Sequence, residues 1–251
     1  LYDGDRIKPT GKIFRAKGLS DLNWYHYREI TTFRDVPDHG KINKPLATHL
    51  RHGYYAATSY LDANVGRLLS ALKETGLSKN TIVVFWSDHG YHLGENSHWT
   101  KVTPRELDAH VPLIFHVPGQ KNGRTSAIVE YIDIYPTLAE LCALPQPAGL
   151  DGDSFNEILQ NPKLNGKDAA FTQVLRPWPT DKTSSTSMGY SLRTRQFRYT
   201  RWVDIETRNT ISEELFDHQT DSMERDNLIE ASGYQATAKQ LRLLMDKTVD
   251  N

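Results

Sequence analysis

Cysteine is nearly absent from this chain of 251 residues, because Cys142 is the only one. A single cysteine excludes an internal disulfide framework and any zinc site built from several thiolates. No window of about 18 apolar residues occurs, so the sequence predicts no membrane span. Excess charge of one sign is also missing: the formal net charge is -1, which gives no support to a general nucleic-acid or membrane-surface role.

The first residues, LYDGDRIKPTGK, lack both an initiator methionine and the apolar core of a signal peptide. They predict a piece of a longer protein, or a processed product. The hydrophobic fraction of 38% and the charged fraction of 24% are ordinary for a globular chain. The length suits one large domain or two small ones.

A helix is predicted where the apolar residues of segment 61–72 recur at spacings of three and four. Gly76 is the expected C-terminal cap of this helix. The run TIVVFW (81–86) then predicts a strand buried on both faces, which is the pattern of a parallel sheet. A second apolar run, VPLIFHV (111–117), predicts another strand.

A further helix is expected in DIYPTLAELCAL (133–144), with Asp133 as its N-cap and Cys142 on its buried face. Helix, strand, strand and helix in this order predict an α/β fold. After Pro145 the chain is rich in proline and glycine, and from about Ala169 it shows short strands and turns with one buried face, followed by a last helix near 234–247. We therefore predict two parts, residues 1–165 and 166–251.

A dense polar cluster, SDHGYHLGENSHWTK, follows the strand predicted at 81–86. Ligands collect outside the carboxyl ends of strands in open α/β sheets. Asp88 offers a hard oxygen of the kind that calcium or magnesium prefers, and His89 offers a nitrogen. Gly90 permits a sharp bend, and Lys101 suits an anionic oxygen. Asp and His at a strand end also cap turns, so these residues alone leave both readings open.

The same cluster resembles the strand-end signature of type I sulfatases, within the alkaline phosphatase superfamily. Several other blocks agree in order: YYAATSYLDANVGRLLSALKETGL, HVPLIFHVPG, DIYPTLAELCAL, LDGDSF, MGYSLRTRQFRYTRWV and EELFDHQTDSMERDNL. Together they resemble the iduronate-2-sulfatase branch in particular, from about residue 46 to 230.

The resemblance implies an α/β fold, part of a sulfatase-like sandwich with a central mixed, mostly parallel sheet. Residues 1–165 would be the C-terminal part of the catalytic domain, and residues 166–251 a smaller α+β subdomain with an antiparallel sheet. The implied activity is hydrolysis of sulfate esters, on a sulfated, uronate-containing glycan. The implied location is an exported one: periplasmic, secreted or lysosomal.

Site residues follow from the resemblance. Asp88 would ligate a divalent cation, Ca²⁺ in preference to Mg²⁺, and His89 would be a further ligand or a close neighbour of the metal with a catalytic role. Lys101 would bind the sulfate ester and help to protonate the leaving alcohol. Tyr91 and His92 would contact the sugar ring or its carboxylate.

Two more cations, Arg176 and Lys182, lie in LRPWPTDK and would favour an anionic sugar at the mouth of the site. A solvated loop is the alternative reading of this segment. Neither interpretation involves nucleic acid.

Two features of the family are missing from these residues: the Cys/Ser-x-Pro-x-Arg motif that carries the formylglycine nucleophile, and an Asp-Asp pair. We therefore expect an N-terminal part of the same enzyme to supply the formylglycine. The alternatives are a phosphodiesterase or phosphonate hydrolase of the same superfamily, or a non-catalytic remnant that binds carbohydrate.

Overall fold

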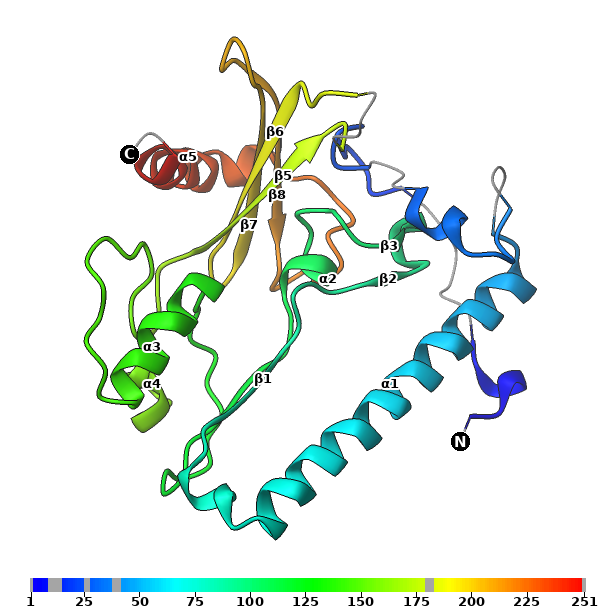
Figure 1. The fold of residues 1–251 in the computed structure, drawn as a ribbon. Helices are drawn as coiled ribbons and strands as arrows, with labels where there is room; N and C mark the ends of the chain where they lie inside the picture. The colour runs from blue at the N-terminus through cyan, green and yellow to red at the C-terminus, as the bar shows by residue number, and fades with distance from the viewer. Residues whose placement is uncertain (1, 9–14, 25–27, 38–41, 179–182, 250–251) are drawn as a thin grey trace. The chain divides into compact units, whose positions relative to one another are not determined.

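The computed structural model describes residues 2–8, 15–24, 28–37, 42–178 and 183–249 (Figure 1). The chain divides into two compact units, Leu1–Gly119 and Gln120–Asn251. The boundary predicted near residue 165 between the catalytic part and the antiparallel-sheet subdomain stays a prediction.

The first unit is dominated by one long helix, α1, at Lys44–Glu74. Its N-cap is Asn43, whose side-chain oxygen accepts a hydrogen bond from the Leu46 amide at 3.0 Å. Gly76 follows the helix at a φ of 73°, in the left-handed region that glycine enters without strain. The predicted helix and its stop are confirmed, although the helix begins well before the periodic apolar residues.

Two short antiparallel ladders complete the regular structure of this unit. Strand β1 (Val83–Trp86) pairs with β4 (Leu113–His116), and β2 (His92–Leu93) pairs with β3 (Trp99–Thr100). The short helical elements of the unit are η1 (Gly4–Arg6), η2 (Arg28–Thr32), η3 (Leu77–Asn80), η4 (Glu95–Ser97) and α2 (Glu106–Ala109).

Strand β1 differs from its prediction as a strand buried on both faces. Val83–Phe85 are half-buried and Trp86 is exposed. Every ladder among the described residues is antiparallel, so no parallel neighbour covers β1 there. An apolar run indicates only that its side chains can be buried. The pairing direction depends on the neighbouring strand, which the run does not specify.

The small core of the first unit joins segments that lie far apart in the sequence. Ile30, Val36, Ala47 and Trp99 are buried together. This cluster fixes η2 against the start of α1 and against the β2–β3 hairpin. The rest of α1 is largely exposed, because Ala47 is its one buried residue.

In the second unit, η5 (Tyr131–Asp133) leads into α3 (Ile134–Leu141), and α4 (Asn156–Gln160) follows. Asp133 does occupy the N-cap position of α3, but its side chain makes no cap bond to that helix. It accepts instead from the amides of Glu130 at 2.8 Å and Asp153 at 2.9 Å. Cys142 is exposed, so its predicted place in the core is wrong. The buried residues of α3 are Pro136, Thr137 and Ala139, which lie on another face.

The second unit contains a four-stranded antiparallel sheet (Figure 1). Its strands, in sheet order, are β5 (Ala170–Arg176), β6 (Ser187–Arg193), β7 (Phe197–Asp204) and β8 (Thr210–Asp217). The last helix, α5 (Gln235–Val249), packs Leu241 and Met245 against sheet residues such as Leu192. The predicted hairpins and terminal helix are confirmed.

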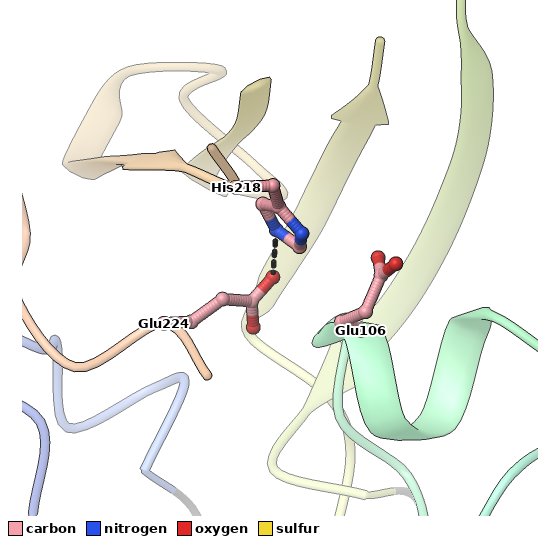
Figure 2. Close-up of side chains that lie close together, drawn as sticks. All are labelled: Glu106, His218 and Glu224. Atoms are coloured by element: carbon pink, nitrogen blue, oxygen red, sulfur yellow. Dashed lines mark hydrogen bonds and ion pairs between the residues drawn. The ribbon is translucent and has the colours of Figure 1, made fainter. Parts of the chain in front are cut away.

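A buried ionic network lies at one end of this sheet. Glu224 accepts from Arg198 Nε at 2.6 Å and lies 3.0 Å from His218 Nε2, a contact that Figure 2 draws. Arg193 Nη2 lies 3.0 Å from His218 Nδ1. A guanidinium group can only donate, so Nδ1 accepts and Nε2 carries the hydrogen that Glu224 accepts.

Among the described residues, no helix combines the length and the apolar character that crossing a bilayer requires.

Candidate active site

The loop that follows β1 presents Asp88 to solvent, with its side chain 81% exposed. The adjacent ring of His89 lies with Nδ1 2.8 Å from the Gly90 carbonyl oxygen and Nε2 3.4 Å from the Asp88 Oδ2. A carbonyl oxygen only accepts, so Nδ1 carries the hydrogen in the neutral ring. Nε2 then turns a lone pair toward the carboxylate.

Two electron-pair donors that face each other at 3.4 Å can share a cation or a proton. Neighbouring ligands at right angles around Ca²⁺, with bonds of 2.3–2.6 Å, lie roughly 3.3–3.7 Å apart. The observed separation therefore fits two ligands of one divalent cation. A protonated imidazole would satisfy the same contact. Calcium takes six to eight oxygen ligands, so one carboxylate and one imidazole are only part of such a site.

Gly90 is required by a close approach of the backbone. Its amide donates to the Asp108 carbonyl oxygen at 2.8 Å. A Cβ atom at this position would lie 1.7 Å from the Leu107 carbonyl oxygen. The contact with the segment at residues 107–108 therefore anchors the loop that carries Asp88 and His89.

A buried acid–imidazole pair lies behind this loop. His92, in β2, is only 1% exposed, and its Nε2 lies 3.4 Å from Asp108 Oδ1. The other Asp108 oxygen accepts from the Thr103 amide at 2.6 Å. Burial raises the pKa of Asp108 to about 6, despite these contacts. The proposed contact of His92 with substrate remains a prediction, and Asp108 carried no motif by which the sequence could mark it.

Lys101 lies at the end of the β2–β3 hairpin and binds Glu29 of η2. Its Nζ is 2.8 Å from Glu29 Oε1, and both side chains are half-buried. The residues on either side, Thr100 and Val102, have φ values of 69° and 79°. These are strained conformations for β-branched residues, of a kind that clusters at functional sites. Glu29 was not identified from the sequence, because 72 residues separate it from Lys101.

Tyr91 lies close enough to Glu29 to be affected by its charge. Burial first, and then the negative charge of Glu29, raise the pKa of Tyr91 to about 12. Its ring lies 5.3 Å from that of Tyr54 on α1. The phenol therefore stays protonated and can donate a hydrogen bond.

The turn between β2 and β3 is fixed by contacts to other elements. Glu95 accepts from the Leu93 amide at 2.6 Å and from Arg51 of α1 at 3.3 Å. Trp24 Nε1 donates to the Asn96 carbonyl oxygen at 3.2 Å. Glu95 is thus part of the support of the loop and not only a surface charge.

Of the two predicted outer cations, one lies within the described residues. Arg176, at the end of β5, is buried, with its guanidinium 5.4 Å from the centre of the Trp202 ring and Nη1 donating to the Leu175 carbonyl oxygen at 2.8 Å. Lys182 lies outside the described residues. The role of both in selecting an anionic sugar stays a prediction.

Comparison with known proteins identifies the family. The sulfatase family profile matches residues 18–143, and the profile of the N-sulphoglucosamine sulphohydrolase C-terminal region matches residues 94–251. Human (Homo sapiens) iduronate 2-sulfatase is 32% identical over 74% of this chain and 45% of its own length. Thus the chain spans less than half of that relative.

Solved structures agree with this result. That of BT4656 with its substrate D-glucosamine-2-N,6-O-disulfate has a TM-score of 0.68 and 28% identity, covering 78% of this chain and 39% of its own. BT1596, a 2-O GAG sulfatase, has a TM-score of 0.69 and 26% identity, covering 83% of this chain and 44% of its own. These matches and the α/β architecture agree, and the chain belongs to the sulfatase family.

Proposed function

We propose that this chain is the C-terminal portion of a metal-dependent sulfatase that hydrolyses sulfate esters of a sulfated, uronate-containing glycan. The observation that carries the proposal is the pair formed by Asp88 and His89, whose facing oxygen and nitrogen suit one divalent cation. The iduronate 2-sulfatase relative supports the uronate, and the structure with D-glucosamine-2-N,6-O-disulfate supports a sulfated sugar.

Asp88 and His89 would hold the cation, with Ca²⁺ as the first candidate and Mg²⁺ as the second. When bound, the cation supplies positive charge that polarises the sulfate ester. Lys101 would donate hydrogen bonds to the ester oxygens and stabilise the charge that develops on the leaving alcohol. Tyr91, as a protonated phenol, would donate to the sugar or its carboxylate.

The formylglycine nucleophile would come from an N-terminal part of the same enzyme. Exposed apolar side chains in the first unit support such a partner: Leu61 and Leu68 on α1, and Trp86 and Ile114 on the β1–β4 ladder, are each at least half exposed. We further propose that the complete enzyme, meaning this chain together with that part, is exported to the periplasm, the exterior or the lysosome.

The experiment is a comparison of substrates with the complete enzyme. A sulfated uronate-containing disaccharide, a phosphate diester and a phosphonate monoester would be assayed with Ca²⁺ and with a chelator. We expect Ca²⁺-dependent release of sulfate, with Asp88→Ala reducing the rate to less than about a tenth. Asp62→Ala, which removes an exposed aspartate of α1, is the matched control and should leave the rate unchanged.

Other outcomes would assign the chain differently. Faster turnover of the phosphate diester or the phosphonate would identify a different hydrolase of the superfamily. Absence of turnover by the complete enzyme, combined with retained binding of the sulfated disaccharide, would identify a non-catalytic carbohydrate-binding protein.

A further inference from the structure

We propose that Glu29 is a positioning residue for Lys101: its carboxylate holds the ammonium group in the orientation from which it meets the ester. This inference rests on the proposed sulfatase function, because it assigns a role relative to the lysine of that site. It concerns the side chains of Glu29, Tyr91 and Lys101 and the backbone at Thr100 and Val102, all in the first unit.

The contact joins two segments that are each next to a buried core residue. Glu29 precedes Ile30, and Lys101 follows Trp99 by two positions, and Ile30 and Trp99 are buried in the same hydrophobic cluster. Both ends of the 2.8 Å contact are therefore anchored by the core. A pair between two mobile surface side chains would lose much of its energy to side-chain entropy, but this one begins from fixed positions.

Burial of the Glu29 carboxylate also costs folding free energy, and the contact with Lys101 does not remove this cost. Its second oxygen, Oε2, is buried and has no hydrogen-bond partner among the described residues. A buried acceptor left unsatisfied costs about 1–3 kcal/mol, and more when it is charged. A residue whose task was only to stabilise the fold would gain from replacement by a neutral side chain. Oε2 thus carries a cost to stability, while Oε1 makes the contact that positions Lys101.

The backbone around Lys101 gives an independent observation. Thr100 and Val102 hold left-handed φ values of 69° and 79°, which cost on the order of 1–3 kcal/mol each. Such a backbone persists only when neighbouring contacts hold it in place. The ion pair with Glu29 is one of these contacts, so its loss should let the loop relax and displace the ammonium group.

A displaced ammonium group should reduce turnover more than binding. A misplacement of about 1 Å near the reacting atoms can reduce a rate by about 10²-fold. Binding of the sugar is spread over other groups, such as Tyr91. We therefore expect Glu29→Ala in the complete enzyme to lower kcat by about 10- to 100-fold and to change KM by less than about threefold.

Two conservative variants of Glu29 distinguish the position of its acceptor oxygen from its negative charge. Glu29→Gln keeps an acceptor oxygen at the same distance, and it should retain kcat within about threefold of the native enzyme. Glu29→Asp keeps the charge but withdraws the oxygen by one methylene, and it should lower kcat by about 10-fold. Glu74→Ala, at the exposed end of α1, is the matched control and should match the native enzyme.

The test uses kcat and KM on the sulfated disaccharide, with thermal unfolding to check that each variant folds. In a Lys101→Ala background, Glu29→Ala should have no further effect on kcat, because the two residues act as a unit. The inference is overturned if Glu29→Asp is as active as the native enzyme, if Glu29→Gln is the more damaged of the two, or if the double variant shows additive losses. A native complete enzyme without sulfatase activity would instead refute the proposed function.

Discussion

The buried network at Glu224 allows a strong prediction about stability. In Glu224→Ala, the guanidinium of Arg198 loses an acceptor at 2.6 Å, and the Nε2–H of His218 loses one at 3.0 Å. Both Arg198 and Glu224 have side chains that are 2% exposed, so bulk water does not reach the groups that Glu224→Ala leaves without a partner. Ser191 Oγ, 3.1 Å from Arg198 Nη1, compensates only in part.

Breaking a buried pair by removing one partner typically costs about 3–5 kcal/mol, because the other charge stays buried. A change of 1 kcal/mol shifts Tm by about 2–4 °C in a cooperative unit of 150–250 residues and by less in a larger one, so the expected loss is at most roughly 6–20 °C. Removing both charges is different, because neither ion is then left without its counterion. Arg198→Met with Glu224→Leu should recover the part of the loss that comes from the unpaired charge, although the Nε2–H of His218 still lacks its acceptor.

Thermal and guanidinium unfolding of the complete enzyme would measure these differences. Asp246→Ala is the matched control: its carboxylate contacts Arg201 at 2.6 Å but is 44% exposed, so its loss should cost less than about 1 kcal/mol. Burial does not set the worth of this pair if Glu224→Ala is no more damaging than Asp246→Ala, or if the double variant is less stable than Glu224→Ala.

Three further predictions concern the first unit. Gly90→Ala should displace the segment at Leu107 and lower both Tm and Ca²⁺ affinity, as calorimetry and titration would detect; unchanged affinity would contradict the role of Gly90. Lys101→Ala should lower kcat by about 10²-fold or more, and a change in KM alone would make Lys101 a binding residue. Burial raises the pKa of Asp108 from 3.8 to about 6, so protonation of Asp108 favours the native state. The resulting contribution to the free energy of unfolding is full below about pH 4 and is lost as the pH rises through about 6. The stability of the native protein relative to Asp108→Asn should fall by at most about 3 kcal/mol across this window in unfolding titrations, and a difference that is independent of pH would contradict the assignment.

Local rules predicted the elements whose causes are local. The end of α1 follows from Gly76, which enters the left-handed region at no cost, and the hairpins of the second unit follow from alternation between turns. The position of Asp88 and His89 just after a strand was also readable, because it needs only an apolar run followed by polar residues.

Contacts between segments that are distant in the sequence cannot be predicted from such local patterns. The apolar run of β1 has the same letters whether its partner is parallel or antiparallel, so the ladder with β4 was missed. Helical spacing predicts Cys142 in the core, but the neighbours of α3 bury another face. In both cases the strand or helix itself is predicted correctly, and the segment that packs against it is not.

By itself, the sequence determined the family, the order of the elements and the polar groups at the strand end, because these depend on residues near one another in the chain. Only the tertiary structure decided that Glu29 meets Lys101, that Asp108 supports the loop at Gly90 and that Glu224 is buried between Arg198 and His218. The physical reason is that each of these contacts depends on core packing or backbone approach between segments whose separation in sequence carries no periodic signal.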